Sequence, residues 1–243
     1  MNINQASKET GISKDMIRFY EKKGLLKPKR DNTNNYRQYD THDIHILITI
    51  KFYSSLGIPI STVYKIMKDG DITLATNTLS NQLDILEEEA FWARAKYILA
   101  KDTNHILDQY KNGIEYDIGT HPKQYFYPTA NTILRKVVTS RLVFRIQSHH
   151  KNNANYPQDT GLLLIEQSRL LQIPNEEIPA YQYIRFIQEV DTRKQIQIDE
   201  IHQLEERIKQ LGYTTYGDIY IYSIFHNLSN TNIETICIEF MIH

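Results

Sequence analysis

GISKDMIRFYEKKGLLKPKRDNTNNYRQY, residues 11–39, is the stretch that decides the fold of this chain. Gly11 is suited to closing one helix, and Ser13 is suited to capping the next. A short basic helix then ends at Lys22-Lys23-Gly24, and the remainder is rich in Pro, Asn, Lys and Arg without helical periodicity. The pattern predicts two helices joined by a turn, followed by a loop or a small two-stranded wing.

The flanking segments extend this stretch into a compact helical domain over residues 1–70. We expect three further short helices, each introduced by a polar cap residue. They cover residues 3–10 with Asn4 as the cap, residues 42–55 with Asp40 or Thr41, and a segment from Ser61 through Met67.

Charge is distributed unevenly along the 243 residues. Residues 1–70 hold 12 lysines and arginines against 7 acidic residues, a net charge of +5, whereas the remainder holds 16 against 22. A basic module joined to an acidic one is typical of a chain whose first part approaches a polyanion.

The second helix carries a basic face. Lys14, Arg18 and Lys22 are spaced by four residues and therefore share one side of the helix. Such a face suits the major groove of DNA, where Arg and Lys reach base edges and phosphates. The alternative is an ordinary solvated surface, with Asp15 and Glu21 as ion-pair partners.

The order of these motifs resembles the N-terminal domain of the MerR family of transcription regulators over residues 3–68. The similarity is carried by Gly11, Ser13, Arg18-Phe19-Tyr20, Gly24-Leu25-Leu26, Pro28, Tyr36-Arg37 and Tyr39. Asn35 stands where the family usually has Gly, and because Asn tolerates left-handed backbone geometry we expect the wing turn to be kept.

The resemblance implies a winged helix-turn-helix whose homodimer binds double-stranded promoter DNA and distorts it so that RNA polymerase can engage. The residues that it marks as DNA-binding are Ser13, Lys14, Arg18, Tyr20, Tyr36, Arg37 and Tyr39. Bending DNA must be offset by additional backbone contacts, which explains why a wing accompanies the helix.

A long helix is predicted after the first domain. Residues 76–111 contain no Gly or Pro, and an apolar stripe runs along Leu79, Leu83, Leu86, Ala90, Ala93 and Tyr97. We expect residues 71–112 to form a dimerisation coiled coil with a second copy of the chain. The alternative is that this helix packs on the C-terminal half of its own chain.

The C-terminal region, residues 113–243, has the character of an α+β domain with a mostly antiparallel sheet. Strands are predicted at 123–127, 161–166, 181–188, 218–226 and 233–242, and helices at 131–148 and 194–211. This pattern resembles the GyrI-like effector-binding domain, which repeats a strand-helix-strand-strand unit around a ligand cleft.

The resemblance implies that this domain binds a bulky aromatic and possibly cationic small-molecule effector. Aromatic faces and one buried carboxylate suit such a ligand. The candidate ligand residues are Tyr127, Tyr181, Tyr183, Tyr220, Tyr222 and Glu239, with Glu166 and Glu234 as substitutes for the carboxylate. The alternative is that most of these aromatics fill the core and that Glu239 faces solvent.

Other classes of function are disfavoured by the sequence. Cys237 is the single cysteine, and the nine histidines, including the pair His149-His150, show no ligand spacing, so we expect no metal site and no cofactor. No Ser/His/Asp or Cys/His arrangement can be placed, so we expect no enzyme. A ligand-modifying enzyme or a protein-interaction module remains the alternative for the C-terminal domain. Without a signal-peptide or membrane-span pattern, we expect a cytoplasmic protein that does not contact a membrane.

Overall fold

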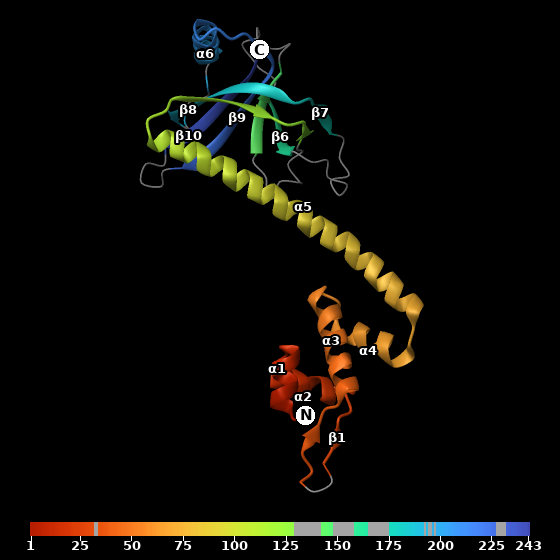
Figure 1. Ribbon diagram of the computed structural model, residues 1–243. Coiled ribbons are helices and arrows are strands. Elements are labelled where there is room, and N and C mark those ends of the chain that lie inside the picture. The colour runs from red at the N-terminus through yellow and green to blue at the C-terminus, as the bar shows by residue number, and fades with distance from the viewer. Residues whose placement is uncertain are drawn as a thin grey trace. The chain divides into compact units, whose positions relative to one another are not determined.

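The computed structural model describes residues 1–31, 34–128, 142–147, 158–164, 175–191, 193, 196, 198–226 and 232–243 (Figure 1). Its contacts divide the chain into two compact units, Met1–Glu89 and Ala90–His243, each of which is described by itself. The first unit is helical and the second is built on a large sheet. The predicted glutamate Glu166, the pair His149-His150 and most of the predicted helix 131–148 lie outside the described residues.

Helices α1 (Ile3–Thr10) and α2 (Lys14–Lys22) form the predicted helix-turn-helix. Ser13 caps α2 as expected, since its side chain accepts a hydrogen bond from the Met16 amide. The cap of α1 is Asn2 and not Asn4, because Asn2 and Gln5 exchange side-chain hydrogen bonds with each other's backbone amides in a capping box.

Two further helices complete the domain. Helix α3 (Thr41–Ser55) is capped by Asp40, which forms a reciprocal capping box with Asp43. Helix α4 (Ile60–Asp69) begins before Ser61, so the prediction that Ser61 is its cap was wrong. Pro59 precedes the first helical residue and makes no side-chain cap.

The wing is a short hairpin of β1 (Lys29–Arg30) and β2 (Arg37–Gln38), paired antiparallel. Asn35 has a φ of 59°, and it is the one described residue other than glycine in the left-handed region. The expected turn is therefore kept with Asn in place of Gly.

An apolar core joins these helices. Its buried members come from all four helices, from the loop after α2 and from the segment after the wing. They include Ala6, Ile17, Tyr20, Leu26, Tyr39, Leu47, Ile50 and Val63. Leu79, on the long helix that follows, packs against the same core.

The long helix is α5 (Ile72–Lys111), four residues longer at its start than predicted. The predicted apolar stripe is divided between the two units. Leu79 belongs to the core of the first unit, whereas Leu83 and Tyr97 are exposed. In the second unit, Phe91 and Trp92 pack against the sheet, so this part of α5 does contact its own C-terminal half.

The sheet of the second unit has eight antiparallel strands in the order β3-β8-β10-β9-β5-β6-β4-β7. The predicted strands correspond to β4 (Gln124–Pro128), β6 (Gln158–Leu164), β8 (Tyr181–Asp191), β9 (Thr215–His226) and β10 (Ile233–Ile242). Strands β3 (Tyr116–His121), β5 (Leu142–Ile146) and β7 (Glu176–Ile178) were not predicted.

Strand β5 corrects the helix predicted over 131–148. Its sequence, LVFRI, is β-branched and aromatic at several positions, and it pairs with β6 on one side and β9 on the other. Sheet pairing of this kind overrides a local helical reading. The other predicted helix is α6 (Ile198–Gln210), shorter than the predicted 194–211, with Ile196 outside it.

The sheet has an internal two-fold pattern. Strand β8, helix α6, β9 and β10 follow in the strand-helix-strand-strand order expected of one repeat, and the strands lie side by side as β8-β10-β9. Strands β4, β5 and β6 repeat that arrangement as β4-β6-β5, and β5 meets β9 at the centre. The strand preceding each half crosses to the other: β3 pairs with β8, and β7 pairs with β4.

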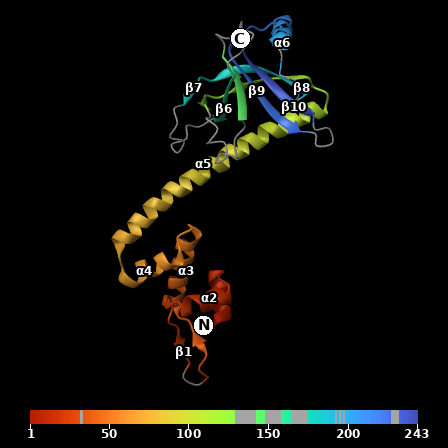
Figure 2. The same ribbon diagram turned by 180° about the vertical axis from the view of Figure 1, so that it is seen from behind.

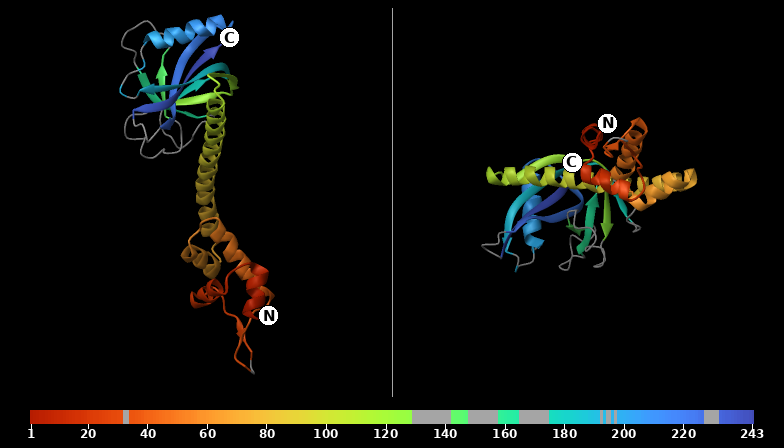
Figure 3. Two further views of the ribbon diagram at one scale, coloured as in Figure 1. Left: turned by 90° about the vertical axis from the view of Figure 1, so that its left-hand side faces the viewer. Right: turned by 90° about the horizontal axis from the view of Figure 1, so that it is seen from below.

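The two faces of the sheet are distinguished by alternation along its central strands. Even-numbered residues of β8 and β10, such as Ile184 and Ile238, form one core with Ile201 and Ile208 of α6. Odd-numbered residues, such as Tyr183 and Cys237, form the other core with Ile106 of α5. Helix α6 and the end of α5 therefore cover opposite faces (Figures 2 and 3).

Candidate functional site

The first candidate site is the surface formed by α2 and the wing. Lys14, Arg18 and Lys22 are all exposed, while Ile17 between them is buried in the core. The guanidinium of Arg18 lies 3.0 Å from the Asp15 carboxylate, and both side chains are more than half exposed. This pair is weak and solvated, so it leaves Arg18 available to other anions.

Glu21 connects α2 to the wing. Its carboxylate accepts a hydrogen bond at 2.6 Å from Nε of Arg37 and a short one from the Tyr39 hydroxyl. Burial, followed by the hydrogen bond to Glu21, raises the pKa of Tyr39 above its ordinary value. The hydrogen bond to Glu21 is the main cause of the raised pKa of Arg37.

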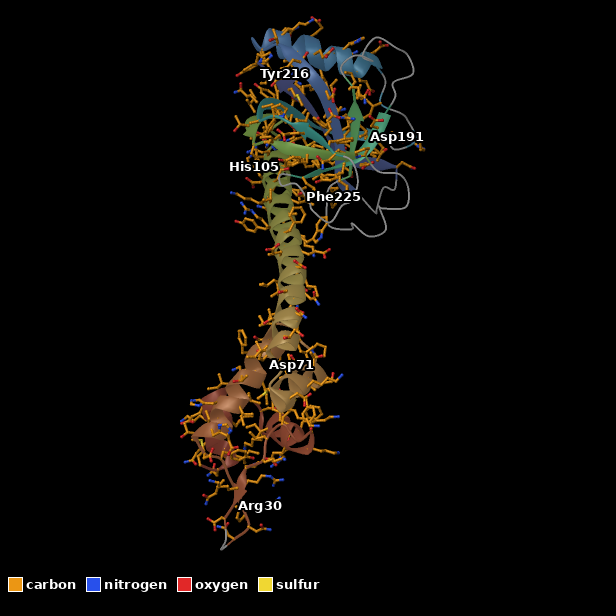
Figure 4. All side chains as sticks on the ribbon, turned by 90° about the vertical axis from the view of Figure 1, so that its right-hand side faces the viewer. Arg30, Asp71, His105, Asp191, Tyr216 and Phe225 are labelled. Atoms are coloured by element: carbon orange, nitrogen blue, oxygen red, sulfur yellow. The ribbon has the colours of Figure 1, made fainter. Side chains whose placement is uncertain are left out.

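The predicted DNA-binding residues other than Arg37, which is half-buried, divide into an exposed group and a buried group. Ser13, Lys14, Arg18 and Tyr36 are exposed, and Tyr36 most so at 74%. Tyr20 and Tyr39 are buried in the domain core, where they support α2 and the wing. Arg30, labelled in Figure 4, lies on the wing and was not among the predicted residues.

The second candidate site is a cavity of about 480 Å³ on the α5 face of the sheet. The end of α5 supplies one wall, which includes Leu99, Asp102 and His105. His105 is labelled in Figure 4. The sheet supplies the other walls from seven strands or their ends. These residues are Thr120, His121, Pro122, Gln124, Val143, Leu163, Leu164, Tyr183, Tyr222 and Glu239.

Polar and charged residues form a continuous row across the sheet on this face. The strand registers align Asp117 with Arg185, Arg185 with Glu239, Glu239 with Tyr220, and Tyr220 with Arg145. The last pair in the row is Arg145 with Asp159. Each charged neighbour in this row is of opposite sign, which allows three buried charges to remain in the core.

Glu239 is 1% exposed and lines the cavity. Its oxygens accept hydrogen bonds from the hydroxyls of Tyr181 at 2.8 Å and Tyr222 at 3.1 Å. Burial by itself would raise the pKa of Glu239, but His121, Arg185 and the Tyr181 hydroxyl together hold the pKa below its ordinary value. The carboxylate is therefore ionised at neutral pH.

Arg185 organises the charges around Glu239. Its guanidinium donates to Asp102 of α5 at 3.0 Å, to Asp117 of β3 at 2.5 Å and to the Tyr222 hydroxyl at 3.0 Å. The nearest contact to Glu239 is 4.0 Å. Burial alone would lower the pKa of Arg185, but Tyr222 and Asp102 outweigh it and the pKa is raised.

His121 lies between Glu239 and two tyrosine rings. Its Nε2 atom is 3.2 Å from each carboxylate oxygen of Glu239. The imidazole stacks on the ring of Tyr183, with centroids 4.4 Å apart, and meets the ring of Tyr181 edge-on.

The predicted ligand residues are partly brought together. Tyr183, Tyr222 and Glu239 line the cavity, and Tyr181 contacts Glu239 directly. Tyr220 belongs to the same core, and its buried hydroxyl has no hydrogen-bond partner within the described part of the chain. Tyr127 packs instead with Phe91 and Trp92 in a separate cluster. The substitute Glu234 lies near the start of β10, in register with Val190 and His226.

Sequence reasoning missed Arg185, His121, and Asp102 of α5. A signal for Arg185 exists, because it stands alone between Ile184 and Phe186 in a strand that is apolar on both faces. No comparable signal marks Asp102 or His121, which join the site only through packing and strand pairing.

Two further features of the described residues bear on other classes of function. Within the ranges given above, the structure holds no group of three or more His, Cys, Asp or Glu side chains that could bind a metal. Among the helices it describes, none is both long and apolar enough to cross a membrane. Cys237 is buried in the core of the sheet.

Comparison with known proteins finds a similarity over most of the first unit. Residues 1–70 match the family described as MerR HTH family regulatory protein. The "Heavy metal-dependent transcription regulator 2" of Rhizobium meliloti is 36% identical over 67 residues, which are 28% of this chain and 46% of that protein. The "Heavy metal-dependent transcription regulator 1" of the same species is 41% identical over 64 residues, 26% and 44% of the two chains.

The similarity to solved structures is more distant. A cryo-EM structure of an EcmrR–DNA complex covers 100% of this chain and 99% of its own, at 16% identity and a TM-score of 0.40. The chain spans about half the length of the curated relatives that it matches. Residues 1–70 of this chain form a helix-turn-helix domain that is similar to the MerR HTH regulatory proteins.

Proposed function

We propose that this chain is a ligand-responsive, DNA-binding transcription regulator whose C-terminal cavity binds a bulky aromatic cation. The observation that carries this proposal is Glu239, a carboxylate that is 1% exposed and lines a cavity bordered by tyrosine rings. A buried carboxylate beside aromatic faces is the complement of a cationic aromatic molecule.

The charges around the cavity support a cationic ligand. The carboxylates of Asp102, Asp117 and Glu239 surround one buried guanidinium, that of Arg185. Lys101 also lines the cavity, but its side chain is exposed to solvent. When His121 is neutral, three carboxylates face one buried guanidinium, so a positive ligand reduces the excess of negative charge, whereas an anion would add to it.

The DNA-binding side of the proposal rests on α2 and the wing. Lys14, Arg18 and Tyr36 are the exposed candidates for contacts to phosphates and base edges. Arg37 is half-buried and held by Glu21, which suits a residue that reaches DNA from a fixed position. We assign Tyr20 and Tyr39 to the support of this surface, because both are buried.

The remaining parts of the proposal concern assembly and output. Exposed apolar residues of α5, such as Leu83 and Tyr97, are available for pairing with a second copy of the chain. Asp102 of α5 contacts Arg185 in the cavity wall, so a ligand has a direct physical connection to this helix. Preference of the ligand for one dimer geometry would shift the population towards a form that distorts promoter DNA for RNA polymerase.

The test is titration calorimetry with ethidium, an aromatic cation, on the full chain and on Glu239→Gln. The substitution keeps the size of the side chain and removes its charge, so we expect ethidium affinity to fall by at least about tenfold, equivalent to about 1.4 kcal/mol. Glu234→Gln, which removes a charge elsewhere on β10, is the matched control and should bind as the wild type does. Equal binding by the wild type and Glu239→Gln would remove the proposed role of this carboxylate.

A further inference from the structure

His121 already fills the position that a charged aromatic ligand would take beside Glu239. Its ring is stacked on Tyr183 at 4.4 Å and tilted by 25°, and it meets Tyr181 edge-on at 5.3 Å. Its Nε2 atom is 3.2 Å from both oxygens of Glu239. One side chain thus uses the aromatic face and the carboxylate together, the two features on which the proposed function relies.

A protonated imidazole is itself a small aromatic cation. It makes with Glu239 and the tyrosine rings the same ion-pair and cation–π contacts that an external ligand would make. We propose that His121 is a built-in occupant of the cation subsite, which an aromatic cation must displace and which makes cation affinity dependent on pH. This inference rests on the proposed function, because it specifies what determines selectivity at the same site.

The fold places His121 there through strand pairing. His121 is the last residue of the edge strand β3 and lies opposite Tyr181 of β8. Two residues earlier, Gly119 lies opposite Tyr183, and a Cβ atom at Gly119 would come within 2.5 Å of the Tyr183 hydroxyl. The absence of a side chain at Gly119 lets the Tyr183 ring lie over β3, where the imidazole stacks on it.

The position of His121 also makes displacement possible. Its side chain is 20% exposed, while that of Glu239 is 2% exposed, so the imidazole lies on the outer side of the carboxylate. Pro122 and Lys123 follow directly and connect β3 to β4. Movement of the imidazole needs no change in the inner strands β8 and β10.

Other charged groups near His121 do not duplicate its role. His105 of α5 also lines the cavity, but its Nε2 atom pairs with Asp117 at 3.4 Å. Arg185 is 4.0 Å from Glu239 and is held by two aspartates. The titratable and charged groups that face this region are Glu239, Tyr181, Tyr183, Arg185, Tyr222, Asp102, His105, Lys101 and Asp117.

Competition between a proton and a ligand has a defined signature. A ligand that must displace a protonated imidazole binds more weakly as pH falls. We expect ethidium affinity of the wild type to rise on the order of tenfold between about pH 5.5 and 7.5. Ethidium keeps its positive charge throughout, so the change belongs to the protein.

The experiment compares the wild type with His121→Asn by fluorescence titration of ethidium across this pH range. Asn retains a hydrogen-bond donor for Glu239 but cannot carry a charge, so the variant should bind more tightly at low pH and show little change with pH. His202→Asn, at an exposed position of α6 on the other side of the sheet, is the matched control and should keep the profile of the wild type. His105→Asn tests the other histidine that lines the cavity. His121→Phe, which retains an aromatic ring without a charge, provides a second uncharged variant if Asn impairs folding, as judged by thermal unfolding.

The outcomes separate this inference from the function on which it rests. Ethidium binding with the same pH profile in the wild type, His121→Asn and His121→Phe would overturn the role of His121 and leave the cation site standing. Absence of ethidium binding in the wild type and in both His121 variants would overturn the cation site and the inference together. A pH profile that is lost in His105→Asn and kept in His121→Asn would show that His105 causes the pH dependence of ethidium affinity. That result would also overturn the proposal.

Discussion

The two units of this chain handle their charges in opposite ways. In the helix-turn-helix unit, Lys14 and Arg18 are exposed around an apolar core, and the motif alone locates them. In the sheet unit, Arg145, Arg185 and Glu239 are buried and kept apart from water by partners on other strands. The difference shows that the position of an exposed charge follows from the helix that carries it. The surroundings of a buried charge follow from the register of neighbouring strands.

The largest loss of stability is expected from Arg185→Met, which removes a buried charge of the sheet unit. The substitution leaves Asp102, Asp117 and Glu239 without their shared guanidinium, and removing one partner of a buried ionic group costs about 3–5 kcal/mol. Urea unfolding followed by circular dichroism should show this loss. Arg193→Met is the control, because that side chain is 68% exposed and its ion pair with Asp191 should contribute at most about 1 kcal/mol. Similar losses in the two variants would contradict the role of burial.

A smaller effect is expected from Glu239→Gln, and it should depend on pH. Because the folded protein holds the pKa of Glu239 below its unfolded value of about 4.3, ionised Glu239 stabilises the fold above that pH. We expect the variant to lose about 1–3 kcal/mol at pH 7, the range for a hydrogen bond to a charged group.

The sign of the pH dependence provides the sharper measurement. The advantage of the wild type over Glu239→Gln should shrink as pH falls below about 4.3 and through the lower pKa of the folded state. Urea midpoints measured from pH 7 down to about pH 3 would reveal it. A difference that stays constant over this range would show that Glu239 does not gain stability from its charge.

The smallest effect on stability is expected from Arg18→Ala. Because Arg18 is exposed and its partner Asp15 is solvated, the free energy of unfolding should change by no more than about 0.5 kcal/mol. Binding to mixed-sequence duplex DNA should nevertheless weaken, and the slope of log affinity against log salt should fall by about 1. Lys65→Ala removes an exposed charge from α4 and serves as the control in the same mobility-shift titration. An unchanged salt slope in Arg18→Ala would remove Arg18 from the DNA contacts.

Much of the helical unit could be predicted because its signals are local. Ser13 is followed by a helix, Gly11 and Gly24 adopt left-handed geometry at helix ends, and Asn35 adopts it in the wing. Errors occurred where two polar residues competed for one cap, as with Asn2 and Asn4. Such choices depend on which side chain reaches the free amides, and residue type alone does not decide it.

The sheet unit was predictable in its strands but less so in its site. Alternation located β8, β9 and β10, and the resemblance to the effector-binding domain pointed to Glu239 on the last strand. His121 and Glu239 are separated by 118 residues, and Asp102 reaches Arg185 from a helix. Those contacts follow from register and packing, which local periodicity does not contain.

The exchanged strands β3 and β7 have a consequence for how the sheet unit folds. Strand β3, which comes first in the sequence of the sheet, pairs with β8 at the edge of the half formed by the last strands. Strand β7 pairs with β4 at the edge of the earlier half. Neither half can complete its hydrogen bonding before the other exists, so the unit should unfold in one cooperative transition and form slowly, since its contacts are distant in sequence. The cavity is lined by residues of both halves, so it should form only when both halves have paired.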